Sequence, residues 1–198
     1  MKNIKKKNNT FIFVFITTIL LVGLGIFLFK YLRQEPDTKE IERKWLISSV
    51  EDIPYDLSKA DKYDIYQSYI SFSPEMRLRN VNNGEFYIFT IKSNMSIDGL
   101  IRDEVEYYIT KEEYEHLLTK KEGTTIHKIR YSIPDGKGNK LQLDVFFDDL
   151  DGLVYLEIEF DSEKEAKDYI QPSWVKKDVT SDKRYKNQSL SQFGIPKE

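Results

Sequence analysis

Two carboxylates and an amine alternate in the segment that begins at Glu40. Glu40, Glu42 and Lys44 occupy every second position, and side chains two residues apart lie on one face of a β-strand. Carboxylate oxygens bind divalent cations such as Mg²⁺, and an ammonium group beside them attracts phosphate. If the segment is a strand, it therefore predicts a face that holds a metal ion against a phosphate group. Alone this is weak evidence, because any half-solvated strand alternates charged and apolar residues.

Charged residues share the same strand phase along the rest of the chain. They are Arg77 and Arg79; Lys92; Arg102, Glu104 and Glu106; Lys128 and Arg130; Asp144; and Glu157 and Glu159. Apolar-in and charged-out is the ordinary arrangement of an antiparallel sheet, so this face could simply be exposed to solvent. Its content of Arg and Glu argues instead for a face that binds phosphate, because Arg binds phosphate through two parallel hydrogen bonds. The pattern leaves open which face lies inside.

Short alternating segments predict the elements that carry these residues. Strands are expected near 40–48, 66–72, 75–81, 85–92, 101–109, 125–133, 140–147 and 153–160, with hairpin turns at 82–84 and 135–139. Thr110 and Glu113, and Ser162 and Glu165, have capping-box spacing and predict helices over 111–120 and 163–170. A further short helix is expected after residues 179–180. Eight short strands with few helices indicate a mainly β (α+β) fold with an antiparallel sheet or barrel.

Composition narrows the chemistry. The 198 residues, 40% of them hydrophobic, are enough for one well-sized domain. The absence of cysteine excludes disulfides and thiolate metal sites, and the two histidines are too few for a histidine-rich zinc site. Hard-metal chemistry with oxygen ligands remains. Residues 1–33 carry six basic and no acidic residues, which leaves the rest at −9, so nucleic acid is not an expected partner.

The N-terminal segment predicts a membrane anchor. Residues 11–29 contain no charge and as a helix would reach ~28 Å, close to the hydrocarbon thickness of a bilayer. A buried helix and a cleaved signal peptide are the alternatives. We expect a basic flank at 1–10, a transmembrane helix at 11–32, a linker at 33–39 and a folded domain at 40–198. The excess of lysine before the span predicts a single-pass protein of the cell membrane whose domain lies outside the cytoplasm.

Read in order, the charged motifs resemble the CYTH family, the triphosphate tunnel metalloenzymes, in their short bacterial form. The resemblance runs from Glu40 to Leu190 through 40–44, 77–79, 102–106, 128–131, 143–146, 157–160, 172–174 and 179–187. Two departures are Gln67-Ser68-Tyr69, where Gln-Gly-Tyr is usual, and the missing glycine after Trp174. The membrane anchor is also unusual. The resemblance implies a closed eight-stranded antiparallel β-barrel, or tunnel, with a few flanking helices.

The resemblance also implies roles for the shared charged face. Substrate-binding candidates are Lys44, Arg77, Arg79, Lys92, Arg102, Lys128, Arg130, Lys183 and Arg184. Metal-ligand candidates are Glu40, Glu42, Glu104, Glu106, Asp144, Glu157 and Glu159, of which Glu157, Glu159, Glu40 and Glu42 are favoured. These carboxylates exceed what one ion needs, so two Mg²⁺ or Mn²⁺ ions are expected. Lys44 is the catalytic candidate if neighbouring cations depress its pKa, and a plain phosphate ligand otherwise.

The expected activity is metal-dependent hydrolysis of a triphosphate, most plausibly inorganic triphosphate. The alternatives among enzymes are a thiamine or nucleoside triphosphatase and an adenylate cyclase, although no base-binding surface is identified. A non-catalytic membrane receptor for polyphosphate or nucleotide is the alternative from another class. The carboxylate pairs favour catalysis, because binding an anion alone is better served by cations without them.

Overall fold

The computed structural model describes residues 39–93, 100–134 and 140–197. The chain divides into two compact units, 1–37 and 38–198, and the second contains all described residues. Its strands are β1 Lys39–Leu46, β2 Asp61–Phe72, β3 Glu75–Val81, β4 Phe86–Ser93, β5 Ile101–Tyr108, β6 Glu122–Pro134, β7 Lys140–Phe146, β8 Val154–Glu159 and β9 Lys177–Asp178. Its α-helices are α2 Lys111–Leu118, α3 Glu163–Asp168 and α4 Asn187–Phe193, and its 3₁₀ turns are η1 Val50–Asp52, η2 Leu57–Lys59, η3 Asp148–Leu150 and η4 Lys183–Tyr185.

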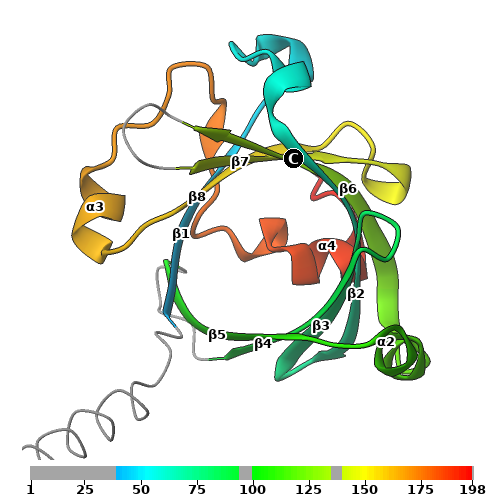
Figure 1. Cartoon of the computed structure of the whole chain (residues 1–198). Helices are drawn as coiled ribbons and strands as arrows, with labels where there is room; N and C mark the ends of the chain where they lie inside the picture. The colour runs from blue at the N-terminus through cyan, green and yellow to red at the C-terminus, as the bar shows by residue number, and fades with distance from the viewer. Residues whose placement is uncertain (1–38, 94–99, 135–139, 198) are drawn as a thin grey trace, which may run out of the picture. The chain divides into compact units, whose positions relative to one another are not determined.

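Eight of these strands close into an antiparallel barrel, as predicted. They follow the order β5-β4-β3-β2-β6-β7-β8-β1, and β5 pairs again with β1 through Glu40 and Arg102. Figure 1 shows the resulting ring of strands, with α2 and α3 outside it. The short β9 adds to the far end of β1. Closure leaves a complete inner and outer wall, so each strand presents one side to the interior of the barrel.

Local sequence explains the turns and helix starts. Asn82 and Asn83 have φ of 50° and 56°, and Gly84 follows at 94°, left-handed values that Asn and Gly adopt most easily. The predicted capping box at α2 is complete, since Thr110 accepts from the Glu113 backbone and Glu113 accepts from the Thr110 backbone. At α3 the Ser162 side chain accepts from the Glu165 backbone. Strand β2 begins five residues earlier than predicted, because Asp61 onward pairs with β6.

The main hydrophobic core lies on the outer wall. Trp45, Leu143, Leu156 and Ile158 are fully buried there against Ala166 of α3. Each of these apolar residues is next in sequence to one of the charged residues. Because successive side chains of a strand point to opposite faces, the charged side chains face the interior of the barrel. The structure thereby settles the question that the pattern left open: helices and loops cover the apolar face, and the charged face lines the interior.

A second cluster fills one end of the barrel from within. It contains inward residues of β1, β2, β6, β7 and β8, such as Tyr69, Phe146 and Tyr155, together with Leu190 of α4. Ser191 and Thr124 exchange hydrogen bonds between α4 and β6, and Gln188 donates to the Phe72 carbonyl at the end of β2. Figure 1 shows α4 inside the outline of the ring. The C-terminal helix therefore crosses this end of the barrel.

The predicted membrane location needs correction. The expected transmembrane helix at 11–32 and its flanks lie outside the described residues. Within the described part, no helix combines the length and the apolar character needed to cross a bilayer. We therefore withdraw the predicted single-pass location with an extracytoplasmic domain. The predicted domain boundary at residue 40 stays a prediction.

Candidate functional site

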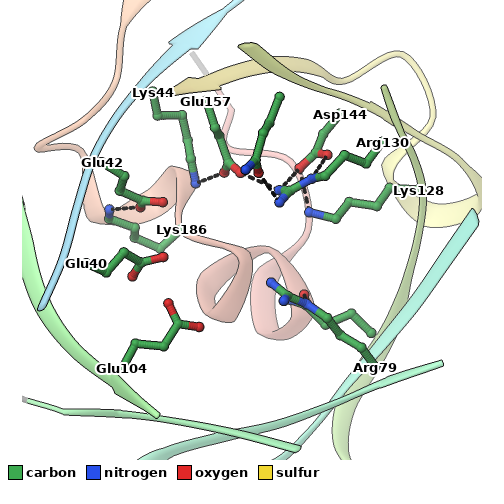
Figure 2. A network of polar contacts seen from close by, with 12 residues as sticks. Glu40, Glu42, Lys44, Arg79, Glu104, Lys128, Arg130, Asp144, Glu157 and Lys186 are labelled. Carbon is green, nitrogen blue, oxygen red and sulfur yellow. Dashed lines mark hydrogen bonds and ion pairs between the residues drawn. The ribbon is translucent and has the colours of Figure 1, made fainter. Parts of the chain in front are cut away.

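The barrel interior is a polar tunnel lined by ionised side chains. The buried charged residues are Glu42, Lys44, Glu75, Arg77, Lys92, Lys128, Asp144, Glu157 and Lys186. Most come from the face that the sequence singled out, and they lie on β1, β3, β4, β6, β7 and β8. Figure 2 shows the head groups of six of them pointing into the space inside the ring: Glu42, Lys44, Lys128, Asp144, Glu157 and Lys186. Because a buried charge is costly alone, each is expected to have a partner.

Asp144 is the centre of the first ion-pair group. One of its oxygens accepts from Lys128 Nζ at 2.5 Å, and Arg130 donates to both oxygens at 2.6 and 2.7 Å. Arg130 also reaches Glu157 at 2.5 Å, and Glu157 binds Lys44 Nζ at 2.7 Å. Burial opposes ionisation, but Arg130 and Lys128 lower the pKa of Asp144. The group joins β1, β6, β7 and β8 into one charged wall (Figure 2).

The opposite wall carries a second group. Lys92 pairs with Glu40 at 2.5 Å and with Glu104 at 3.0 Å, and Glu104 pairs with Arg77 at 2.7 Å. Glu106 accepts from Arg79 at 3.0 Å and from the Thr90 hydroxyl at 2.9 Å. Arg102 pairs with Glu75 at 2.5 Å. The predicted cations and acids are thus interleaved.

Two lysines of the first group have opposite electrostatic environments. Burial would lower the pKa of Lys44, but Glu157 and Glu42 outweigh it and raise that pKa. Glu157 and Glu42 therefore hold Lys44 in its charged form, and its role as a catalytic group or as a phosphate ligand stays a prediction. For Lys128, burial and the neighbouring Arg130 lower the pKa to about 7.

Two carboxylates near one another, those of Glu40 and Glu159, are harder to ionise than usual. Burial and the neighbouring Glu42 raise the pKa of Glu40 to about 7. Partial burial and Glu40 raise the pKa of Glu159, which has no ion-pair partner among the described residues. Oxygen donors that repel one another form the type of set that Mg²⁺ binds and relieves. The described residues nevertheless contain no group of three or more acidic or histidine side chains already arranged around one point.

The structure does not bring Lys183 and Arg184 to the tunnel carboxylates. Both are exposed at η4, and Arg184 pairs with Asp182 at 2.8 Å on the surface. Lys186, which caps α4, points inward instead, and its Nζ donates to Glu42 at 2.8 Å (Figure 2). Burial opposes it, but Lys44 and Lys186 lower the pKa of Glu42. Glu42 is therefore neutralised by two lysines.

Sequence reasoning missed several buried polar residues of the described tunnel, among them Lys186, Glu75 and Gln67. Lys186 stands in a basic segment whose spacing does not show which member turns inward. Glu75 opens β3 with the phase of Arg77, and that phase was the available signal. Gln67 carries no charge, so a search for charged positions passes over it.

Comparisons with known proteins agree with this geometry. The profile of the CYTH domain family matches residues 38–192. The inorganic triphosphatase of Nitrosomonas europaea is 38% identical over 162 residues, which cover 79% of this chain and 99% of that protein. The inorganic triphosphatase of Acetivibrio thermocellus is 34% identical over 154 residues, covering 77% and 92%. A crystal structure of an inorganic triphosphatase is similar, with a TM-score of 0.56 and 35% identity over 77% of this chain and 93% of that one.

Proposed function

The chain belongs to the CYTH domain family, and we propose that it hydrolyses inorganic triphosphate with a divalent cation held inside its barrel. Both relatives named above are inorganic triphosphatases, and each is matched over more than nine-tenths of its length. This chain is accordingly a triphosphate-hydrolysing enzyme. The choice of inorganic triphosphate and the need for a metal are our proposal.

The buried cations of the tunnel carry the proposal. A triphosphate has about four negative charges, which leave water only where cations replace the lost hydration. Lys44, Arg77, Lys92 and Lys128 are each at most 5% exposed and approach the interior from four strands. Cations on opposite walls can hold a row of phosphates in line, so the tunnel supplies positioning and charge stabilisation together.

Each class of side chain then has its own task. The guanidinium groups of Arg77 and Arg79 bind phosphate oxygens through paired hydrogen bonds. Arg130 already donates to Asp144, Glu157 and Gln142, so it contributes mainly its charge. The ammonium groups of Lys44 and Lys92 neutralise charge. A phosphate beside Lys128 stabilises its protonated form, so binding keeps that residue charged at neutral pH.

The metal ligands we propose are Glu40 and Glu159, with Glu104 beside them. The raised pKa of Glu40 and of Glu159 supports this choice, because the repulsion between neighbouring carboxylates that contributes to it is what a divalent cation would relieve. A divalent cation held by these residues would withdraw charge from the phosphates and lower the pKa of a water in the site. A second ion stays a prediction.

Phosphate release from a panel of triphosphates tests the proposal. Inorganic triphosphate, thiamine triphosphate and ATP would each be supplied with Mg²⁺, with Mn²⁺ and with a chelator. We expect the highest kcat/KM for inorganic triphosphate and no release with the chelator. Faster release from ATP or thiamine triphosphate would contradict the substrate, and full activity with the chelator would contradict the metal. Tight binding without release from any compound would support the receptor alternative.

A further inference from the structure

Gln67 is an uncharged residue buried among the charges of the tunnel wall. It lies on β2, and its side chain is 0% exposed. The β2–β3 register places it directly opposite Arg79. None of the roles assigned above uses it, although a buried amide must be satisfied at both its oxygen and its nitrogen.

Both ends of the Gln67 amide are engaged. Its Oε1 accepts from Arg79 Nε at 3.1 Å, and its Nε2 donates to the Tyr69 hydroxyl oxygen at 2.8 Å. Arg79 Nε can only donate, so the amide oxygen must face it. The Tyr69 ring is fully buried in the inner hydrophobic cluster. The apolar end of the barrel thus anchors Tyr69, Tyr69 orients Gln67, and Gln67 orients the guanidinium of Arg79.

Arg79 differs from its neighbours in how little negative charge surrounds it. Its partners are the neutral Gln67 and Glu106, whose side chain is 42% exposed. Burial and the adjacent Arg77 lower the pKa of Arg79. Arg130, by contrast, is held by two buried carboxylates, Asp144 and Glu157, which outweigh burial and raise its pKa. The positive charge of Arg79 is therefore the less compensated of the two.

We propose that Gln67 is a positioning residue that fixes the Arg79 guanidinium toward the triphosphate without adding a negative charge beside it. An amide oxygen accepts the Nε hydrogen bond as a carboxylate would, but adds no charge that competes with phosphate. This inference rests on the proposed function, because the phosphate is the group that uses the charge. A residue needed only for folding would tolerate a carboxylate at this place without a specific loss of substrate binding.

Gln67→Glu separates positioning from folding, because it keeps the shape and the acceptor and adds a charge. We expect its melting temperature to stay at or above that of the wild type, since the new carboxylate pairs with Arg79. Binding of inorganic triphosphate, measured by calorimetry without metal, should weaken roughly 10- to 100-fold, the effect of losing one charge-assisted bond. Unchanged binding would overturn the inference.

Gln142→Glu is the matched control. Gln142 also accepts from an arginine, Arg130, but that arginine already has two carboxylate partners, so the added charge should weaken binding less. An equal loss in both variants would mean a general charge effect and would overturn the inference.

Gln67→Met keeps the length of the side chain and removes both hydrogen bonds. We expect a raised KM for inorganic triphosphate in the wild-type background and no further rise in the Arg79→Ala background, because coupled residues are not additive. Additive effects would contradict a role through Arg79. If the wild type binds triphosphate but releases no phosphate, the proposed function is wrong, and the binding data still test the role of Gln67. If the wild type does not bind triphosphate at all, the proposed function and the inference about Gln67 are both wrong.

Discussion

Asp144→Asn should destabilise the protein strongly, because it removes the charge that holds two buried cations. Asp144 and Lys128 are both 0% exposed, and three contacts of 2.5 to 2.7 Å join Asp144 to Lys128 and Arg130. Removing one partner of a buried ion pair costs about 3–5 kcal/mol of unfolding free energy. In a chain of this size that is a fall in melting temperature of roughly 6–20 °C.

The loss of unfolding free energy caused by Asp144→Asn should also depend on pH, and the environment of Lys128 determines in which direction. The pKa of Lys128 is about 7 in the fold and 10.5 in the reference state. Between about pH 7 and 10.5 the unfolded chain therefore binds a proton that the folded protein does not, and the free energy of unfolding rises with pH. Below pH 7 the wild type has no such slope from Lys128. Without Asp144 the pKa of Lys128 falls further, so the slope of up to ~1.4 kcal/mol per pH unit extends below pH 7 and the loss grows as pH falls.

Urea unfolding of the full chain at pH 6, 7 and 8.5 measures both effects. Asp168→Asn is the control: it makes the same chemical change at an exposed i,i+4 pair with Lys164 on α3 and should alter stability by less than about 0.5 kcal/mol. A loss below about 1 kcal/mol for Asp144→Asn, or a loss that does not increase at pH 6, would refute a charge-locked tunnel wall.

Four further outcomes are expected. Glu159→Gln should abolish Mg²⁺-dependent phosphate release with little change in melting temperature, since it lacks an ion-pair partner in the described structure; near-normal turnover would remove it from the metal set. Arg79→Ala should weaken inorganic triphosphate binding roughly 10- to 100-fold, and unaltered calorimetric affinity would argue against a phosphate contact. Mg²⁺ affinity without substrate should rise as pH increases through about 7, because Glu40, with its pKa raised to about 7, must release a proton; the slope should vanish in Glu40→Gln, and its persistence there would assign the proton elsewhere. A chain that starts at Asp37 should unfold cooperatively as a monomer, and an aggregated or non-cooperative product would show that residues 1–36 are needed for folding.

The strands could be predicted from sequence because alternation is a local property. Segments such as 75–81 and 101–109 agree with β3 and β5 within a residue, and the turn at 82–84 has the residues that its backbone angles require. The inner face could not be predicted from alternation, because an apolar face packs equally well beneath covering helices or against an inner core. Closure of β5 onto β1 and the burial of Trp45 under the α3 segment decide it.

The site residues were harder to predict where a turn sets the direction of a side chain, or where the residue carries no charge. Lys186 and Arg184 are two residues apart, yet one reaches Glu42 and the other pairs with Asp182, because η4 and the start of α4 orient them differently. No periodicity encodes that choice. Gln67 could not be predicted because its role depends on an uncharged hydrogen-bond acceptor lying beside Arg79. That contact is known only once the fold has brought Gln67, Arg79 and Tyr69 together.

The placement of the main hydrophobic core outside the barrel has a consequence for how this chain can change over time. Along β8, Leu156 and Ile158 bury the outer wall while Glu157 faces the tunnel. Neighbouring residues of one strand are therefore expected to be under separate selective pressures, one for a stable outer wall and the other for the charge pattern inside the barrel. Exchanging the ion-paired residues Glu75 and Arg102 would keep both charges inside the barrel and would leave the outer wall unchanged. Specificity can therefore change at tunnel positions as long as each buried charge keeps a partner, because a buried charge left without one also destabilises the barrel.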